Sequence, residues 1–435
     1  MIDHFFTLLN FIDDAIWSYV GIPLIIGFGF YLSIHFKFPQ ITGFPRIISL
    51  FARLARKQTD EERGVHPLHA FFASIGGAIG LGNVVAVCTA VQIGGPGAIF
   101  WMWVAGLIGM LVKYSEIYLG LKYRIQNEQG GYNGGPMYFL QHAYKFTWIP
   151  KLVCLLFCIY GVEVYMFRIV TESIALNFAI NKFIVLAVLL TLILIAVRGG
   201  VERVGKICTA ILPIFILVYF CMNSWILLQH LNEIPAALMD IFTGAFNGHA
   251  ATGAFTGSTM LVAMSQGVRR ACYTGDIGVG YASIVHSESS MKNPAQQASL
   301  GIFGIFLDTF IICTLTILVI LITGMWCTNI DASQVVQATL ELYFPYMNYF
   351  MPVFFFLLGY SSMITFFVAG IKCARFAFGE KGVSFYYVYA VIAFVVCSFV
   401  GTQEALTIMS VSGACLLMVN LIGIVLLRKE VKADW

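Results

Sequence analysis

Charged side chains are scarce in this 435-residue chain, where Asp, Glu, Lys and Arg make up 11% of the residues and hydrophobic residues make up 59%. Soluble globular domains contain about 25% charged residues, so the composition argues against such a domain. The longest polar stretch, 53–67, is short enough to be a solvated loop or an interfacial helix. Because apolar windows of bilayer length, roughly 20 residues each, recur along the chain, we expect a polytopic membrane protein.

Basic residues are absent from the first twenty positions, which contain three aspartates. A cleavable signal peptide begins with positive charge, so this segment is expected to be a retained helix. The eleven cysteines fall mainly inside apolar segments, and no disulfide framework is predicted. The Gly-rich stretch 127–136 lacks the Gly-Lys-Ser/Thr ending of a phosphate-binding loop, so we expect no nucleotide cofactor and no nucleic-acid partner.

Eleven apolar segments are candidate membrane spans, at about 16–36, 69–92, 98–121, 149–178, 183–197, 204–228, 236–264, 297–325, 348–374, 385–401 and 405–427. If the N-terminus is outside, most Lys and Arg residues fall in inner connections, including Arg269 and Arg270. This bias follows the positive-inside rule. It predicts a multi-pass protein of the cytoplasmic (inner or plasma) membrane, with its N-terminus outside and its C-terminus in the cytoplasm.

The second of these segments contains a polar, glycine-rich interruption, AIGLGNVVAVCTAVQIGGPG at 78–97. In hydrocarbon every backbone amide must be bonded within its segment, so such a break survives only where protein or a wet cavity surrounds it. Gly80, Gly82 and Asn83 are therefore candidate substrate-binding residues. Close helix packing by the glycines and capping of a half-helix by Asn83 are the simpler interpretations.

A second glycine-rich stretch, 243–264, lies five segments later, in a segment of opposite direction. Paired breaks in two inverted halves are typical of the central site of a secondary transporter. The chain therefore divides into an N-terminal span and loop (1–68), a first five-helix repeat (69–235) and a second, inverted repeat (236–435). Candidate substrate-binding residues in this second glycine-rich stretch are Thr252, Gly253, Phe255 and Thr256. His249, in the same stretch, is a candidate proton carrier or a satisfied polar group. Packing is the alternative for Phe255.

Such breaks suit a small zwitterion. The N-terminus of a half-helix exposes unbonded N–H groups that can hold a carboxylate, and unwound carbonyls can coordinate a sodium ion. The breaks alone therefore indicate a small zwitterionic ligand and Na⁺, with no other cofactor.

The stretch GLGNVVAVCTAVQIGGPGAIFWMWVAGLIGMLVKYSEIYLGLKYR (80–124) resembles the signature of the alanine or glycine:cation symporter family. The resemblance continues through GVRRACYTGDIGVGYASIVH (267–286) and FGIFLDTFIICTLTILVIL (303–321). It implies an all-α, LeuT-like fold of 5+5 inverted repeats with an extra N-terminal helix. It also implies cation-coupled symport of a small amino acid such as alanine or glycine, and not enzymatic activity.

The same resemblance implies a sodium site. The carbonyls of Gly76 and Ile79 would face hydroxyls of the ninth segment, from Ser361, Ser362 or Thr365. Interhelical hydrogen bonding is the other interpretation of these hydroxyls. The sequence departs from the family pattern at 274–276, at 360–362 and at 172–173. Tyr360 replaces a family Trp, so it is expected to line the substrate pocket.

Charged residues inside the fourth segment, 149–178, stand out because each is costly in hydrocarbon. Arg168 and Glu172 are spaced to pair along one helix face. Glu163 has no such partner, so we expect it to hold a proton, and Glu163 and Glu172 are candidate proton-coupling residues. Satisfaction of Glu163 by a neighbouring helix is the alternative.

Other functions remain open. A proton-coupled or substrate-divergent permease fits the same pattern, whereas a channel would normally show a selectivity motif, which is absent. An intramembrane aspartyl protease would need Asp276 and Asp308 to share a proton, although they lie on separate segments. A structural scaffold has no need of paired breaks.

Overall fold

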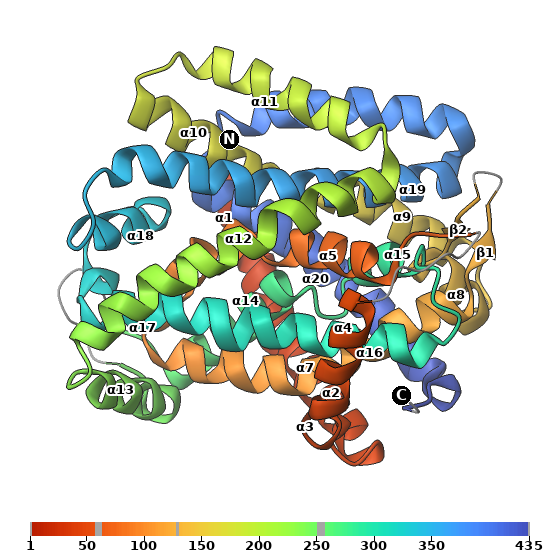
Figure 1. Cartoon of the computed structure of the whole chain (residues 1–435), viewed down its shortest axis with the longest axis horizontal. Coiled ribbons are helices and arrows are strands. Elements are labelled where there is room, and N and C mark those ends of the chain that lie inside the picture. Colours follow the sequence, from red (N-terminus) through yellow and green to blue (C-terminus); the bar gives the residue numbers. More distant parts are fainter. Residues whose placement is uncertain (1, 57–62, 128–129, 250–256, 434–435) are drawn as a thin grey trace.

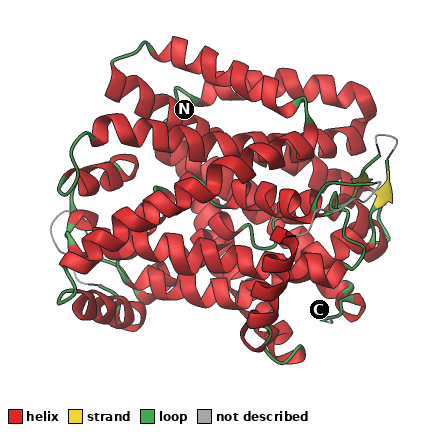
Figure 2. Ribbon diagram, in the orientation of Figure 1, coloured by secondary structure: helices red, strands yellow, loops and turns green. Residues whose placement is uncertain are grey.

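The computed structural model describes residues 2–56, 63–127, 130–249 and 257–433, nearly all of them helical (Figure 2). The helices in chain order are α1 (Ile2–Ile16), η1 (Trp17–Gly21), α2 (Ile22–His35), α3 (Pro39–Thr42), α4 (Phe44–Arg56), α5 (Pro67–Ala78), η2 (Leu81–Asn83), α6 (Ala86–Gly94), α7 (Gly97–Lys122), α8 (Pro136–Ala143), α9 (Trp148–Tyr160), α10 (Val164–Phe178), α11 (Lys182–Val197), α12 (Gly200–Gln229), α13 (Ile234–Asn247), α14 (Met260–Gly275), α15 (Tyr281–His286), α16 (Pro294–Ile305), η3 (Phe306–Cys313), α17 (Thr314–Ile322), η4 (Met325–Cys327), α18 (Ala332–Glu341), α19 (Met347–Cys397), α20 (Thr402–Leu426) and η5 (Arg428–Glu430). Strands β1 (Ile125–Gln126) and β2 (Tyr132–Asn133) form an antiparallel hairpin.

The helices form one bundle, with short elements at its two ends and long packed helices between them. α13 and α18 lie at one end in Figure 1, and the β1–β2 hairpin with α8 lies at the opposite end. α7 packs against both α14 and α16, while α19 packs against α5, α9 and α10. Residues 276–280, between α14 and α15, are all buried, so protein surrounds them. Such surroundings are where a non-helical stretch can persist in a membrane.

The first span starts earlier than the sequence indicated. A helical run suitable for crossing a membrane extends from His4 to His35, whereas the prediction began at residue 16. The acidic residues made the start look too polar for a span. Asp13 is buried, however, and accepts a hydrogen bond from the Arg269 guanidinium at 2.7 Å, so its charge is compensated within the bundle.

The predicted break in the second segment is confirmed. α5 ends at Ala78, the chain passes through the single turn η2, and α6 starts at Ala86. The two halves are bent by 47°. The fourth predicted segment is also divided, since α9 and α10 are separated by Gly161–Glu163, where Glu163 adopts a left-handed conformation with φ 54°.

The predicted interruption of the segment 236–264 is present, because α13 ends at Asn247 and the next helix, α14, begins only at Met260 and continues to Gly275. Residues 250–256, between these two helices, lie outside the described residues. A further non-helical stretch, Asp276–Gly280, then separates α14 from α15, with Asp276, Gly278 and Gly280 all at positive φ. We call the stretch between α5 and α6 the first break and Asp276–Gly280 the second break. The placement of Arg269 and Arg270 in an inner connection is wrong, because both are buried on α14.

The last predicted spans are joined. α19 runs through both 348–374 and most of 385–401, with one non-helical residue, Gly379 at φ 67°, at the kink. Within the described residues, seven helices are long and apolar enough to cross a membrane, or eight if the bent α5–α6 pair counts as one span. The count of eleven stays a prediction.

Candidate functional site

The break after α5 replaces a backbone hydrogen bond to the Gly76 carbonyl by hydrogen bonds from side chains. In a continuous helix the Gly80 N–H would bond the Gly76 carbonyl, but here it donates to the Asn83 side-chain oxygen at 3.0 Å. The Gly76 carbonyl instead accepts from Ser362 Oγ at 2.8 Å and from Ser361 Oγ at 3.3 Å. A Cβ at Gly80 would overlap the Ser362 hydroxyl, so this close approach requires glycine.

The structure therefore brings together most of the predicted sodium ligands. Gly76, Ser361 and Ser362 meet between α5 and α19, all of them buried. Ile79 lies directly after α5 and is also buried. The Ser361 and Ser362 hydroxyls also reach the Leu358 carbonyl of their own helix, at 2.8 and 3.3 Å. Both hydrogen bonds of the Thr365 hydroxyl stay within α19, to the carbonyls of Ser361 and Ser362 at 3.0 and 2.8 Å.

A second group of oxygens surrounds Asp308, which is completely buried in η3. Its carboxylate accepts from Asn83 Nδ2, from Thr274 Oγ1 at 3.2 Å and from Thr309 Oγ1 at 2.8 Å. These donors come from the first break, the end of α14 and η3 itself. No Lys, Arg or His forms an ion pair with Asp308 within the described parts of the chain. A buried carboxylate with only neutral donors needs either a counter-charge or a proton to offset the cost of its burial.

Charged side chains form hydrogen bonds with the helix ends on both sides of the second break. Lys113 Nζ donates to the Gly275 carbonyl at the C-terminus of α14, at 2.8 Å. Asp276 accepts from the Ala282 N–H in the first turn of α15, also at 2.8 Å. A cation at a helix C-terminus and a carboxylate at a helix N-terminus each match the helix dipole.

Two further side chains hold the residues after this break. Glu116 accepts from the Ser283 N–H at 3.3 Å and from Asn420 Nδ2 at 3.2 Å. Asn420 Nδ2 also donates to the Gly278 carbonyl at 2.9 Å. Asp276 and Asp308 thus belong to separate networks, and no hydrogen bond among the described residues joins them, so the geometry gives no support to a shared-proton protease pair.

Several predicted substrate residues are placed at the first break. Gly80, Gly82 and Asn83 are buried there, with the Gly82 backbone close to Tyr273 and Thr274. The predicted residues of the second glycine-rich stretch, Thr252, Gly253, Phe255 and Thr256, lie outside the described residues. His249, next to them, forms a backbone bridge with Ser258, and its ring packs on Trp326.

Tyr360 does not reach the break. Its hydroxyl donates to the Leu192 carbonyl of α11 at 3.0 Å, and its ring stacks on Phe356. The expectation that Tyr360 lines the pocket was based on a residue replacement alone. The helical repeat turns it toward α11, while Ser361 and Ser362 face Gly76.

The carboxylates of the fourth segment have different positions. The predicted pairing of Arg168 with Glu172 is confirmed. Glu172 also lines a cavity of about 340 Å³ between α10 and α18. Glu163 is completely buried and accepts from the Tyr273 hydroxyl at 3.2 Å. Its other oxygen has no hydrogen-bond partner in the described part of the chain.

Sequence reasoning missed Tyr273, Thr274 and the role of Asp308. The available signal was a lone carboxylate in the apolar stretch FGIFLDTFIICTL, which by itself marks an intramembrane functional group. Thr274 lies in a stretch whose positive charges made it look like a solvated connection.

The chain is similar to known proteins over nearly its whole length. A profile described as the sodium:alanine symporter family matches residues 3–435. The sodium/alanine symporter AgcS of Methanococcus maripaludis is 30% identical over 446 residues, covering 99% of this chain and 96% of AgcS. The amino-acid carrier protein AlsT of Bacillus subtilis is 29% identical over 428 residues, covering 97% of this chain and 90% of AlsT.

The fold is shared with solved transporters. The crystal structure of MhsT in complex with L-phenylalanine superimposes with a TM-score of 0.59 at 15% sequence identity, covering 84% of this chain and 90% of MhsT. This likeness confirms the all-helical, LeuT-type fold that the sequence predicted.

Proposed function

Because the chain belongs to the sodium:alanine symporter family, we propose that it couples the uptake of a small neutral amino acid, such as alanine or glycine, to a sodium gradient. It is a multi-pass membrane transporter and not an enzyme. We place it in the cytoplasmic membrane, with the N-terminus outside and the C-terminus in the cytoplasm.

The observation that carries the proposal is the convergence of hard oxygen atoms on two helix breaks. The Gly76 carbonyl and the Ser361 and Ser362 hydroxyls that donate to it form one group, and the Asp308 carboxylate with Thr274 and Thr309 forms the other. Carbonyl, hydroxyl and carboxylate oxygens are the ligands that alkali and other hard cations prefer. Asn83 contacts both the first break and Asp308, so it connects the two groups.

The same geometry explains how an ion could be coupled to a substrate. Without a cation, the Asp308 carboxylate is an uncompensated charge in a low-dielectric interior. A bound sodium ion removes this penalty and fixes Asn83, and through it the unwound backbone at Gly80, where the N-terminus of the next half-helix can hold a substrate carboxylate. Ion binding thus favours substrate binding, and by linkage the substrate favours the ion.

The experiment is uptake of radiolabelled alanine into proteoliposomes containing the purified protein. An inward sodium gradient should drive accumulation above equilibrium, and dissipating the gradient should release the alanine. Counterflow against glycine, L-alanine, D-alanine, serine and larger amino acids then ranks the substrates. Uptake indifferent to both sodium and pH gradients would refute the proposal.

Proton coupling is the second candidate, and Glu163 is the observation that favours it. This carboxylate is buried, and one of its oxygens has no hydrogen-bond partner among the described residues. Its other oxygen accepts from Tyr273, and the next residue, Thr274, donates a hydrogen bond to Asp308. If Glu163 exchanges a proton during transport, Glu163→Gln should abolish the pH dependence of uptake while the sodium dependence remains. A mutant with the parental pH profile would rule out this role.

A further inference from the structure

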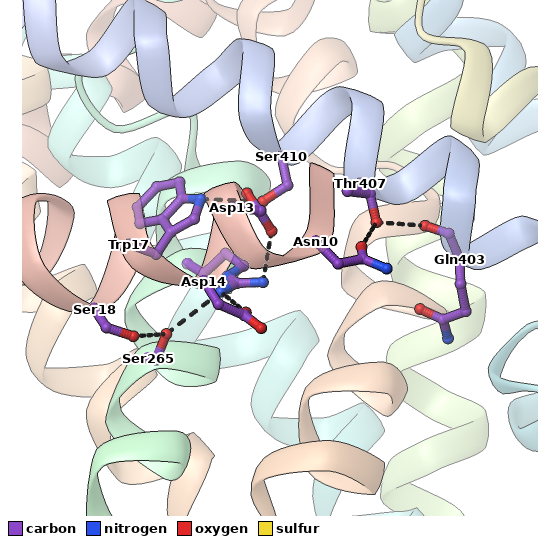
Figure 3. Close-up of polar contacts among 10 residues, drawn as sticks. Asn10, Asp13, Asp14, Trp17, Ser18, Ser265, Gln403, Thr407 and Ser410 are labelled. Carbon is purple, nitrogen blue, oxygen red and sulfur yellow. Dashed lines mark hydrogen bonds and ion pairs between the residues drawn. The ribbon is translucent and has the colours of Figure 1, made fainter. Parts of the chain in front are cut away.

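A second polar cavity lies away from the two breaks, where α1 packs on the bundle. Its volume is about 330 Å³, and its walls come from α1, the last turn of α6, α14 and the first turns of α20. We call it the α1 cavity. Figure 3 shows how α1 and the adjoining η1 are held there: Trp17 Nε1 of η1 donates to Ser410 Oγ at 3.0 Å, and Thr407 Oγ1 donates to Asn10 of α1 at 2.7 Å.

The α1 cavity opens at an end of the bundle. Ile93, in the last turn of α6, is 42% exposed, and Gln403 lies in the first turn of α20. Both helices end or begin at this level, so the opening lies at the bundle surface near the helix ends.

Some polar atoms in the cavity wall are matched and others are not. The Arg269 guanidinium donates to Asp13 and to Asp14, each at 2.7 Å. Arg270 is 3% exposed, yet its Nε and Nη1 atoms have no hydrogen-bond partner, and no described carboxylate lies within ion-pair distance of it. Buried arginine groups normally have partners, because an uncompensated buried charge is costly.

The unmatched acceptors lie in the same wall. Gln266 Oε1 and Asp13 Oδ1 are buried and have no donor among the described residues. Gln266, Asp13 and Arg270 all line the α1 cavity. The wall thus offers free donors on one side chain and free acceptors on two others, which is the pattern that a molecule with one anionic and one cationic group would satisfy.

We propose that the α1 cavity binds the zwitterionic backbone of a free α-amino acid. The carboxylate accepts hydrogen bonds from the Arg270 guanidinium, and the ammonium donates to Gln266 Oε1 and Asp13 Oδ1. The inference that the ligand is an amino acid rests on the proposed function; the recognition chemistry rests on the cavity itself.

The position of Arg270 indicates what such a site does. Tyr273 and Thr274 follow three and four residues later on α14 and contact Glu163 and Asp308. Four residues of α-helix span about 6 Å, so the occupant of the α1 cavity lies roughly one turn from the central site. It is a waiting position outside the ion-binding region.

The test is equilibrium binding of radiolabelled alanine to the purified full-length protein, in sodium and in choline buffer. The α1 cavity contains none of the proposed sodium ligands. The wild-type protein should therefore show a component of alanine binding that does not depend on sodium. Arg270→Gln should weaken that component roughly tenfold or more, because it removes a charge-assisted hydrogen bond. Alaninamide and propionate, which each lack one charged group, should compete poorly for it.

Two further variants keep the test decisive. Gln266→Leu removes only an acceptor and should weaken the same component, which covers the case in which Arg270→Gln fails to fold. Arg203→Gln is the matched control, since it removes an arginine on α12 outside the cavity and should bind as wild type does.

The proposal is overturned if wild type binds alanine only in sodium, or if both folded variants bind as wild type does. Failure of the proposed function looks different, because wild-type proteoliposomes would then show no ion-driven uptake, whatever the binding of Arg270→Gln.

Discussion

Asp308 lies at the site formed by the two helix breaks, and its carboxylate is surrounded there by uncharged groups. It is completely buried, and its three described partners are an amide and two hydroxyls. An ionised carboxylate in such surroundings is stable only with a counter-charge, and the described residues provide no ion pair for it. A transported cation is the natural counter-charge.

Replacing this carboxylate by its amide isolates the effect of charge. Asp308→Asn keeps the size and one acceptor oxygen, so we expect folded protein whose half-saturating sodium concentration for alanine uptake rises tenfold or more. Asp240→Asn, an exposed carboxylate on α13, is the control and should leave the sodium curve unchanged. A wild-type sodium curve for Asp308→Asn would show that this group does not bind the ion.

The hydroxyls at Gly76 allow a graded test. Ser362→Ala removes the ligand at 2.8 Å from the Gly76 carbonyl oxygen, and a loss of about 1 kcal/mol raises half-saturating sodium roughly fivefold. Ser361→Ala should act in the same direction. Thr365→Ala is the matched control, because its hydroxyl bonds within α19. Equal effects on sodium and on alanine affinity at saturating sodium would point to packing instead.

At the scale of elements, the sequence predicted the break after α5 but not the one at Asp276–Gly280. At 78–83, glycines interrupt a strongly apolar segment, so the interruption is visible in the sequence. The stretch 276–280 begins with Asp276 and follows Arg269 and Arg270, and these charges resemble an inner connection between spans. Arg269 pairs with Asp13 on α1, and Asp276 accepts from the Ala282 N–H of α15. Both partners are contributed by tertiary structure, which a local pattern cannot contain.

The backbone of the second break provides a stability prediction. Gly280 has φ 111°, and a Cβ there would lie 2.5 Å from Pro136 Cγ, so Gly280→Ala should cost about 3 kcal/mol or more. Gly278 has φ 74° with no atom nearer than 3.5 Å, so Gly278→Ala should cost about 1 kcal/mol. Thermal denaturation of the two purified variants decides the point. Equal melting temperatures would mean that the break rearranges to accept either side chain.

At the scale of the whole molecule, the N-terminal helix is attached to the functional core through α14. Asp13 and Asp14 both bond Arg269, which lies one turn before Tyr273 on the helix that leads into the second break. The sequence predicted an additional N-terminal span but not this attachment, because Arg269 was assigned to an inner connection and Asp13 precedes the predicted start of the first span at residue 16. Helix α1 is thus a structural support for α14.

The two acidic residues should contribute unequally to this attachment. Asp13 is buried, so Asp13→Asn should lower the free energy of unfolding by about 2 kcal/mol. Asp14 is mostly exposed, with 66% of its side chain accessible, so Asp14→Asn should cost less than about 1 kcal/mol. Melting temperatures of the purified variants compare them directly, and a larger loss for Asp14→Asn would contradict the account.

The central claim is that ion and substrate are linked at the two breaks. It is tested most directly by measuring alanine affinity of the purified protein across a range of sodium concentrations at constant pH and ionic strength. The account predicts that the dissociation constant of the sodium-dependent component falls as sodium rises, and that Asp308→Asn flattens this dependence. An alanine affinity that is identical in sodium and in choline would contradict it.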